Sequence, residues 1–216
     1  TRTCHLTGMP SLLIASHNTH KMAEMATILG EDFDVQSLAR HNGAPEVEEN
    51  GDTFTANAVK KAVETAAWLS SQALGQALPD FVLADDSGLA VDALGGSPGV
   101  HSARFAGDNG NSTDEANNAK LLRALAGVTG DDRGAQFQCV LALAALGQAS
   151  EVRTFDGICR GRIAQAESGQ AGFGYDPLFI PDGHDLSFAE LGPLVKNATS
   201  HRARALAKLA EYLGRG

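Results

Sequence analysis

The chain has 216 residues, of which 43% are hydrophobic and 20% are charged. These proportions are typical of a soluble globular protein and exclude a largely disordered chain. The net charge of −9 and the pI near 5.2 argue against binding to long nucleic acid, because that function needs a basic surface.

Residues 1–10 lack the apolar middle of a signal peptide, so we expect a disordered extension there, or one added for expression. Residues 11–216 are expected to form a single domain. No uncharged stretch reaches the length of a bilayer, which predicts no membrane association. Three cysteines without metal-ligand spacing favour neither disulfides nor a cysteine metal site, and they predict a reducing, cytoplasmic location.

A strand, a polar loop and a helix are predicted first. Residues 12–15 are apolar, residues 16–20 are polar, and apolar residues at helical spacing follow from Lys21. Loop amides and a helix N-terminus together make an anion site, and a lysine there can point at a bound phosphate. The same pattern is also compatible with a capped surface helix. The candidate residues are Ser16, His17, Asn18, Thr19, His20 and Lys21.

A long helix is predicted over residues 52–74, with an alanine-rich stripe suited to close packing on a sheet. Glu49 lies just before it and is a candidate oxygen ligand for Mg²⁺. Lys61, within the helix, is a candidate phosphate contact. Acidic residues before a helix also favour its dipole, which is a purely structural explanation.

Two adjacent carboxylates, Asp85 and Asp86, follow an apolar strand at residues 81–84 and are predicted to form a turn with Ser87 and Gly88. Desolvating both carboxylates is costly unless a metal ion or several donors pair with them. One carboxylate holding a metal while another activates water suits phosphoanhydride hydrolysis. Asp-Ser-Gly is equally good turn chemistry.

The later elements indicate a mixed sheet with helices around it. They are a glycine-rich loop at 95–99, a helix at 112–125, an antiparallel hairpin of strands 135–143 and 152–164 with a turn at 147–150, a short helix capped by residues 187–190, and a last helix at about 200–213.

Two glycines flank an aromatic ring at Gly172, Phe173 and Gly174, which lets the backbone approach a flat ligand closely. Phe173 is a candidate to stack on a base, and Asp176 to accept a hydrogen bond from its edge. A Gly/Pro turn around a core aromatic is the alternative.

Lys196, His201 and Arg202 are placed near a helix start, where cations oppose the helix dipole. A buried oxo group or phosphate beside them would resolve that conflict.

Taken together, these segments resemble the inosine triphosphate pyrophosphatase family from about Leu12 to Leu213. The run ADDSGLAVDAL at 84–94 and the Ser-His-Arg at 200–202 are close matches. The resemblance implies an α/β fold (mixed α+β), with a long central mixed β-sheet flanked by helices and two lobes with a substrate cleft between them. It also implies a homodimer and Mg²⁺-dependent hydrolysis of ITP, dITP and XTP to the monophosphate and pyrophosphate.

By motif position, the resemblance implies roles for individual residues. Asp86, with Asp85 beside it, matches the catalytic carboxylate, and Glu49 and Asp86 match the metal ligands. The substrate-binding positions it implies are Ser16, His17, Asn18, Thr19, His20 and Lys21 for the triphosphate, Ser87 as a further substrate contact, and Phe173, Gly174, Tyr175, Asp176, Lys196, His201 and Arg202 around the base.

Three other functions compete with this one. A Maf-like pyrophosphatase would act on other modified nucleotides. A catalytically silent nucleotide-binding regulator is disfavoured by Glu49, Asp85 and Asp86, since a pure anion binder gains little from carboxylates. A haloacid-dehalogenase-type phosphatase is disfavoured because its two motif aspartates are separated by one residue, whereas here they are adjacent.

Overall fold

The computed structural model describes residues 8–41, 43–72, 78–107, 110–146 and 151–214. The predicted extension at 1–10 lies outside the described residues up to residue 7, and the predicted turn at 147–150 lies wholly outside them. Pro10 is buried, and its carbonyl accepts a 2.9 Å hydrogen bond from the Asp34 amide. The backbone at Pro10 is therefore already tied to the neighbouring strand.

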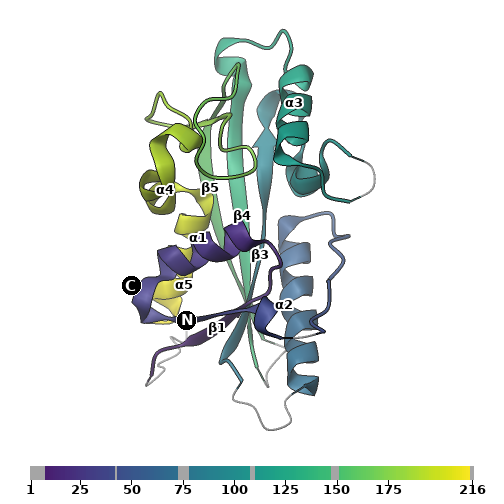
Figure 1. Cartoon of the computed structure of the whole chain (residues 1–216), viewed down its shortest axis with the longest axis vertical. Coiled ribbons are helices and arrows are strands. Elements are labelled where there is room, and N and C mark those ends of the chain that lie inside the picture. The colour runs from purple at the N-terminus through teal and green to yellow at the C-terminus, as the bar shows by residue number, and fades with distance from the viewer. Residues whose placement is uncertain (1–7, 42, 73–77, 108–109, 147–150, 215–216) are drawn as a thin grey trace. The chain divides into compact units, whose positions relative to one another are not determined.

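Helices and strands alternate along the first half of the chain (Figure 1). In chain order they are β1 (Ser11–Ile14), α1 (Thr19–Leu29), β2 (Asp34–Ser37), α2 (Phe54–Ser71), β3 (Phe81–Val91), α3 (Asp114–Ala124), β4 (Gly134–Ala145), β5 (Val152–Ile163), β6 (Phe179–Pro181), α4 (Phe188–Thr199) and α5 (His201–Tyr212). Short 3-10 helices cover Gly30–Asp32, Leu38–Arg40, Asp92–Leu94, Gly99–Arg104 and Gly130–Arg133.

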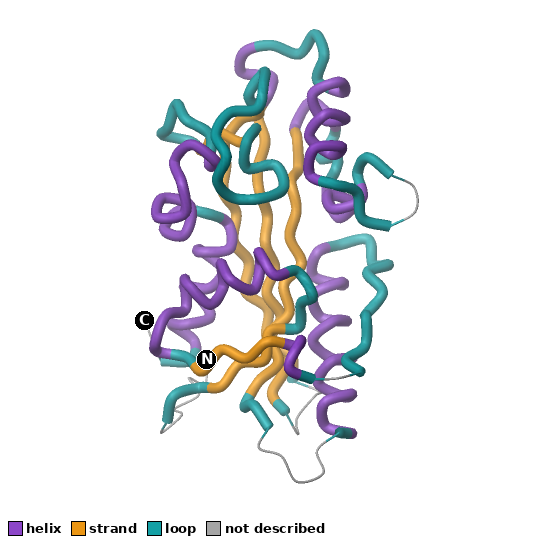
Figure 2. The backbone as a smooth tube through the Cα atoms, viewed as in Figure 1, coloured by secondary structure: helices purple, strands orange, loops and turns teal. Residues whose placement is uncertain are grey.

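The strands form one sheet in the order β2-β1-β3-β4-β5-β6, drawn in orange in Figure 2. β1 runs parallel to β2 and β3, whereas β5 and β6 are antiparallel. β4 and β5 are neighbours of 12 residues each, joined by residues 146–151 alone. That link reaches roughly 20 Å while each strand is roughly 40 Å long, so the two strands must be antiparallel. The predicted mixed sheet is confirmed.

The predicted turn at Asp85–Gly88 is wrong, because these residues lie inside the long strand β3. Gly88 explains part of this. A Cβ there would lie 2.5 Å from the Gly99 carbonyl oxygen, so only glycine lets the strand continue past that carbonyl. Ser102 fixes the approach, since its Oγ accepts a 2.9 Å bond from the Leu89 amide and donates a 2.6 Å bond to the Gly99 carbonyl.

The chain divides into two compact units, and β3, β4 and β5 contribute residues to both. The first contains the chain up to Asp86, Val140–Asp156, and the chain from Arg204 onward. Its core includes the predicted alanine stripe of α2, which packs with apolar residues of β1, β3 and β4. These core residues are Leu13, Ala15, Leu38, Ala58, Ala62, Ala66, Leu69, Val82, Ala84, Ala142 and Ala144.

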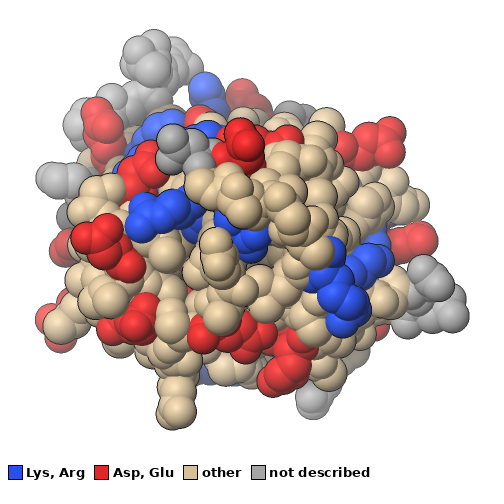
Figure 3. All heavy atoms as spheres, turned by 90° about the horizontal axis from the view of Figure 1, so that it is seen from above, with Lys and Arg blue, Asp and Glu red and all other residues tan. Residues whose placement is uncertain are grey.

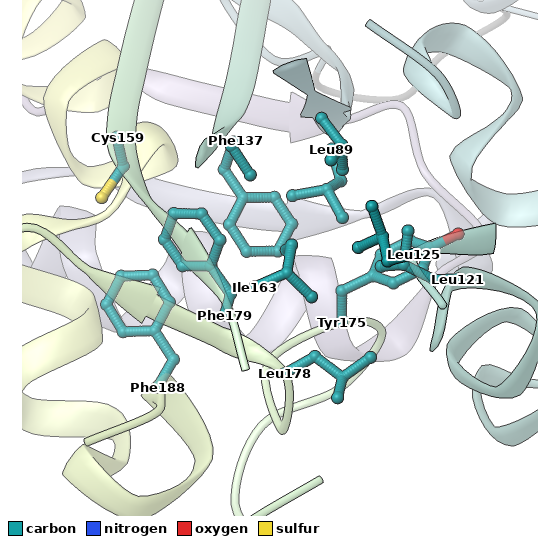
Figure 4. Packing of buried hydrophobic residues seen from close by; sticks show 12 residues of the cluster. Leu89, Leu121, Leu125, Phe137, Cys159, Ile163, Tyr175, Leu178, Phe179 and Phe188 are labelled. Atoms are coloured by element: carbon teal, nitrogen blue, oxygen red, sulfur yellow. The ribbon is translucent and has the colours of Figure 1, made fainter. Parts of the chain in front are cut away.

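The second unit comprises Ser87–Cys139 and Gly157–Ala203 and has a core rich in aromatic residues (Figure 4). The ring centroids of Phe137 and Phe179 are 4.6 Å apart, and those of Phe179 and Phe188 are 5.5 Å apart. Offset ring pairs of this kind stabilise a core beyond the apolar area that they bury.

One buried arginine binds backbone carbonyls from two segments of the second unit. Arg133, only 6% exposed, donates to four backbone carbonyls: Leu125 at 3.1 Å, Val128 at 2.9 Å, and Ile163 and Ala164 at 2.8 Å each. The guanidinium thus binds carbonyls just beyond α3 and at the end of β5 at the same time.

The short helix predicted to be capped by residues 187–190 is α4, which has 12 residues. Ser187 and Glu190 form a reciprocal capping box at its start. Gly192, with φ of 78°, and Pro193 interrupt the helical geometry, and the helix continues beyond them.

No helix in the described part of the chain has the length and apolar character needed to cross a membrane. On the face that Figure 3 shows, the described basic and acidic side chains are interspersed, and no continuous basic surface forms there. This distribution agrees with the acidic net charge in giving no support to binding of long nucleic acid.

Candidate active site

The polar loop after β1 ends earlier than predicted, because α1 begins at Thr19 and not at Lys21. The Asn18 side chain caps the helix by accepting a 3.0 Å hydrogen bond from the Lys21 amide, and the Asn18 amide donates to Ser16 Oγ at 3.1 Å. His20 therefore lies in the first helical turn, which carries no acidic residue. The positive end of the helix dipole is left available to an anion.

Lys21 pairs with the first of the two adjacent carboxylates. Its Nζ lies 2.6 Å from Asp85 Oδ1, and the Asp85 side chain is completely buried, whereas that of Lys21 is 19% exposed. A buried carboxylate is tolerated when a cation this close compensates for its lost hydration. The ion pair thus explains how Asp85 can stand within a strand.

Lys61 joins α2 to the segment that contains Glu49. Its Nζ contacts Glu49 Oε1 and donates a 2.5 Å hydrogen bond to the Asp85 carbonyl. Gly51 is fixed nearby, because its amide donates to Asn57 Oδ1 at 2.8 Å. The Glu49 carboxylate is therefore held close to the centre of β3.

Asp86 is the most unusual group of this set. It is 4% exposed, and its Oδ2 has no hydrogen-bond partner in the described part of the chain. Burial raises the pKa of Asp86 to about 6, and the negative charge of Glu49 adds to the rise. Lys61, Lys21 and a hydrogen bond from Asn57 act in the opposite direction.

We call Lys21, Glu49, Lys61, Asp85 and Asp86 the carboxylate–lysine cluster; all five belong to the first unit. It combines two lysine ammonium groups with a buried carboxylate oxygen that has no hydrogen-bond partner among the described residues. This is the arrangement expected of a site for a polyanion and a hard cation.

A second group of predicted residues gathers in the second unit around Phe173. Lys196 Nζ lies 2.6 Å from Asp176 Oδ2 and 4.2 Å from the centroid of the Phe173 ring. The same Asp176 oxygen accepts a 2.9 Å hydrogen bond from the Phe173 amide. Arg202 is 1% exposed; its Cζ lies 6.0 Å from the Phe173 ring centroid, and it donates to Ser87 Oγ at 2.9 Å. We call Ser87, Phe173, Asp176, Lys196 and Arg202 the Phe173 cluster.

The prediction that Lys196 lies at a helix start is wrong. It lies in the last turn of α4, where the helix dipole favours a cation. Arg202 does lie in the first turn of α5. Between them, Ser200 Oγ accepts a 3.2 Å hydrogen bond from the Ala203 amide, which starts the new helix.

The remaining predicted residues are less directly connected to either cluster. His17, Asn18, Thr19 and His20 are exposed. The ring of His201, 3% exposed, stacks on Phe137 at 4.7 Å between centroids. The buried Tyr175 hydroxyl donates to the Ser102 carbonyl at 2.8 Å.

The chain matches the Ham1 family over residues 12–212. It belongs to the Ham1 family. It is 45% identical over 205 residues to the dITP/XTP pyrophosphatase of Shouchella clausii, covering 95% of this chain and 97% of that protein. It is 48% identical over 200 residues to the dITP/XTP pyrophosphatase of Rhodopirellula baltica, covering 92% and 90%.

Solved Ham1 structures agree with the fold. The Staphylococcus aureus Ham1 protein superposes with a TM-score of 0.78 at 39% identity, covering 94% of this chain and 98% of that one. The nucleoside-triphosphatase / dITP/XTP pyrophosphatase of Mycobacterium abscessus gives a TM-score of 0.70 at 40% identity, covering 92% and 98%. The family resemblance inferred from the sequence is confirmed.

Whether these residues fit a magnesium ion can be tested on the carboxylates themselves. Among the described residues, no group of three or more His, Cys, Asp or Glu side chains stands ready as a metal cage. Mg²⁺ does not need one, since it is commonly held by one or two carboxylates, with water and substrate phosphates completing its shell. Asp86 supplies a buried oxygen that has no hydrogen-bond partner in the described ranges, and Glu49 is close enough to raise the Asp86 pKa. The donor set fits the ion.

Sequence reasoning missed the part that Asn57 plays. This 1%-exposed residue donates a hydrogen bond to the Asp86 side chain and accepts one from the Gly51 amide. A polar residue on the alanine stripe of α2, four residues before Lys61, was the available signal. Residues on one helix face at this spacing lie beside each other.

Proposed function

We propose that this protein hydrolyses the non-standard purine nucleoside triphosphates ITP, dITP and XTP to the monophosphate and pyrophosphate. One observation carries the proposal. In a Ham1 chain, a nearly buried carboxylate with an open oxygen, Asp86, lies in one cluster with two lysines and a second carboxylate. The dITP/XTP pyrophosphatases to which the chain is similar support the choice of substrates.

The carboxylate–lysine cluster would act on the phosphates. Lys21 and Lys61 would neutralise phosphate oxygens. The amides of the α1 N-terminus, together with Ser16, would hold the far end of the triphosphate. A water molecule would attack the α-phosphorus, the bond from that phosphorus to the bridging oxygen would break, and pyrophosphate would leave. Asp86 is better suited than Asp85 to take the proton from that water, because Asp85 Oδ1 is occupied by Lys21.

We propose Mg²⁺ as the cofactor, with Asp86 and Glu49 as its protein ligands. When bound, the ion would offset the negative charge that builds on the phosphates during hydrolysis. Lys61, which contacts Glu49, would keep that carboxylate oriented. The ordinary protein-bound role of Mg²⁺ with nucleotides supports this choice.

The Phe173 cluster would bind the base. The Phe173 ring would stack on it, and Lys196 and Arg202 would donate hydrogen bonds to a 6-oxo group. Adenine carries an amino group at that position, and leaving buried donors unpaired can cost selectivity factors of roughly 10⁴. Replacing Arg202 with alanine should therefore reduce the preference for ITP over ATP, and an unchanged preference would contradict this assignment of the base site.

Product analysis with ITP, XTP, GTP and ATP, each with and without Mg²⁺, tests the function. We expect IMP and XMP together with pyrophosphate, only in the presence of Mg²⁺, and weak turnover of ATP and GTP. Release of orthophosphate in place of pyrophosphate would contradict the proposed bond cleavage. Turnover restricted to modified pyrimidine nucleotides would indicate a Maf-like activity, and binding without turnover a regulator.

We further propose that the protein acts as a homodimer in the cytoplasm. The family resemblance supports the dimer, and the buried cysteines Cys139 and Cys159 are compatible with a reducing compartment. Sedimentation analysis of the purified protein tests the dimer, which predicts about twice the 22.5 kDa chain mass.

A further inference from the structure

Two side chains of α3 bind the peptide groups of one glycine in the loop after Phe173. Asp114 Oδ2 accepts a 2.6 Å hydrogen bond from the Gly174 amide, and Asn118 Nδ2 donates a 3.1 Å bond to the Gly174 carbonyl. The two residues are four apart on the helix, so they lie on one face, one turn apart. Together they hold Gly174 from both sides of its α-carbon.

Gly174 has a φ of 63°, a left-handed conformation that favours glycine, and it directly follows Phe173. The rest of the loop is held by other groups: Asp176 binds the Phe173 amide, and the Tyr175 hydroxyl binds the Ser102 carbonyl. The two hydrogen bonds from α3 to Gly174 are thus a separate restraint on the backbone that carries the Phe173 ring.

Asn118 is poorly suited to a purely stabilising role. It is 2% exposed, and its Oδ1 is buried without a hydrogen-bond partner among the described residues. A buried polar atom left unpaired lowers stability, and an apolar side chain of similar volume would avoid that cost. The amide is therefore better explained by its hydrogen bond to Gly174 than by packing.

We propose that α3, through Asp114 and Asn118, sets the position of Phe173 and thereby determines how well the Phe173 cluster binds a purine base. Both are positioning residues that act through Gly174. The inference rests on the proposed function, because it concerns the base-binding part of that site. Loss of either hydrogen bond to Gly174 should weaken binding of the base and leave the chemistry at the α-phosphorus largely unchanged.

The test compares two matched pairs of alanine variants. Asp114→Ala is paired with Glu115→Ala, since both residues are exposed acids in the first turn of α3. Asn118→Ala is paired with Asn117→Ala. Asn117 is equally buried, but it binds the Ala103 carbonyl and the Ala106 amide and not Gly174.

Steady-state kinetics with ITP and calorimetric binding of IMP and of inorganic tripolyphosphate are the readouts. For Asp114→Ala and Asn118→Ala we expect KM for ITP and Kd for IMP to rise roughly five- to tenfold, the effect of losing one hydrogen bond, with kcat within about twofold. Tripolyphosphate, which has no base, should bind these variants with the same Kd as the unchanged protein. The control variants should keep both constants, and Asp114→Asn, which retains an acceptor, should recover part of the loss.

Each failure has its own signature. If the unchanged protein turns over no purine triphosphate and binds no IMP, the proposed function falls, and the base-positioning role of α3 falls with it. If the unchanged protein is active and both Gly174-binding variants keep their KM and IMP affinity, only the inference is overturned. A loss of kcat or of tripolyphosphate binding equal to the loss of IMP binding would also overturn it, since that would indicate a general structural defect.

Discussion

The carboxylate–lysine cluster and the Phe173 cluster treat buried charge in different ways. In the first, the lysine side chains remain 19% and 12% exposed, and one oxygen of Asp86 has no hydrogen-bond partner among the residues that the structure describes. In the second, Lys196 and Asp176 are 7% and 2% exposed and are paired with each other. In the second cluster the lysine and the aspartate compensate each other, and Arg202, bound to the neutral Ser87, adds one more buried cation beside the Phe173 ring.

The two clusters share one device. In each, an asparagine from a nearby helix binds the backbone of a glycine in the adjoining loop: Asn57 binds Gly51, and Asn118 binds Gly174. Backbone groups held in this way place a neighbouring side chain without contributing to the chemistry themselves. The contrast between the clusters therefore lies in their charges, and the means of holding the loops is common to both.

The largest effect should come from the open carboxylate. Asp86→Asn should lower kcat by roughly 10³-fold or more, because it would remove both the proposed proton acceptor and a proposed metal ligand. Steady-state kinetics with ITP and Mg²⁺ would measure this. The matched control is Asp92→Asn, at an exposed aspartate just beyond β3 that pairs with Arg160, and it should retain normal turnover. Near-normal turnover of Asp86→Asn would rule out the proposed role.

Breaking the buried ion pair between Asp176 and Lys196 should lower the stability of the fold. Asp176→Ala leaves Lys196 buried without its partner and should lower the free energy of unfolding by about 3–5 kcal/mol. Chemical denaturation would measure the loss. The double variant Asp176→Leu/Lys196→Met should recover a large part of it, because it removes both charges. If Asp176→Ala lowers the free energy of unfolding by less than about 1 kcal/mol, the buried charge of Lys196 does not depend on Asp176.

The raised pKa of Asp86 predicts the sign of a pH effect. The folded protein holds this proton up to about pH 6, whereas the unfolded chain releases it near pH 3.8. The folded state therefore binds more protons between these values, and the contribution of Asp86 to stability falls as the pH rises through them, by at most about 3 kcal/mol. Denaturation at pH 4.5 and pH 7 without Mg²⁺ should show this loss, and Asp86→Asn should lack it. A contribution that increases with pH would contradict the assignment.

The smallest effect is expected at an exposed pair outside both clusters. Lys208 and Asp156 lie 2.9 Å apart, but their side chains are 52% and 69% exposed. Lys208→Ala should change the free energy of unfolding by less than about 1 kcal/mol, since solvent screens such pairs. The same denaturation experiment checks this value, and a larger loss would mean that exposure is a poor guide to which charges matter here.

The sequence was sufficient to predict helices and strands, and the mixed sheet, because these follow from the local spacing of apolar residues. It failed where distant groups decide local structure. The Asp-Asp-Ser-Gly segment has the composition of a turn, yet it continues a strand because Lys21 compensates Asp85 and Gly88 accommodates the Gly99 carbonyl. Neither contact can be read from neighbouring residues.

The choice of candidate site residues rests largely on the family resemblance, and the sequence did not predict the contacts among them. Nothing in the spacing of Lys196 and Asp176 indicates that they pair with each other. Asn57 and Asn118 were overlooked because a buried asparagine in a helix has no distinctive sequence pattern, although a polar residue on an apolar face is a usable signal. Their significance depends on which loop each helix contacts.

Arg133 has a consequence for the order in which the second unit opens. Its four hydrogen bonds bring the chain just beyond α3 and the end of β5 onto a single guanidinium. Lysine has neither the planar geometry nor enough donors to replace it. Local opening should therefore start at this junction once the guanidinium is lost, and native-state hydrogen exchange of an Arg133→Lys variant should accelerate first at the amides around Leu125 and Ile163.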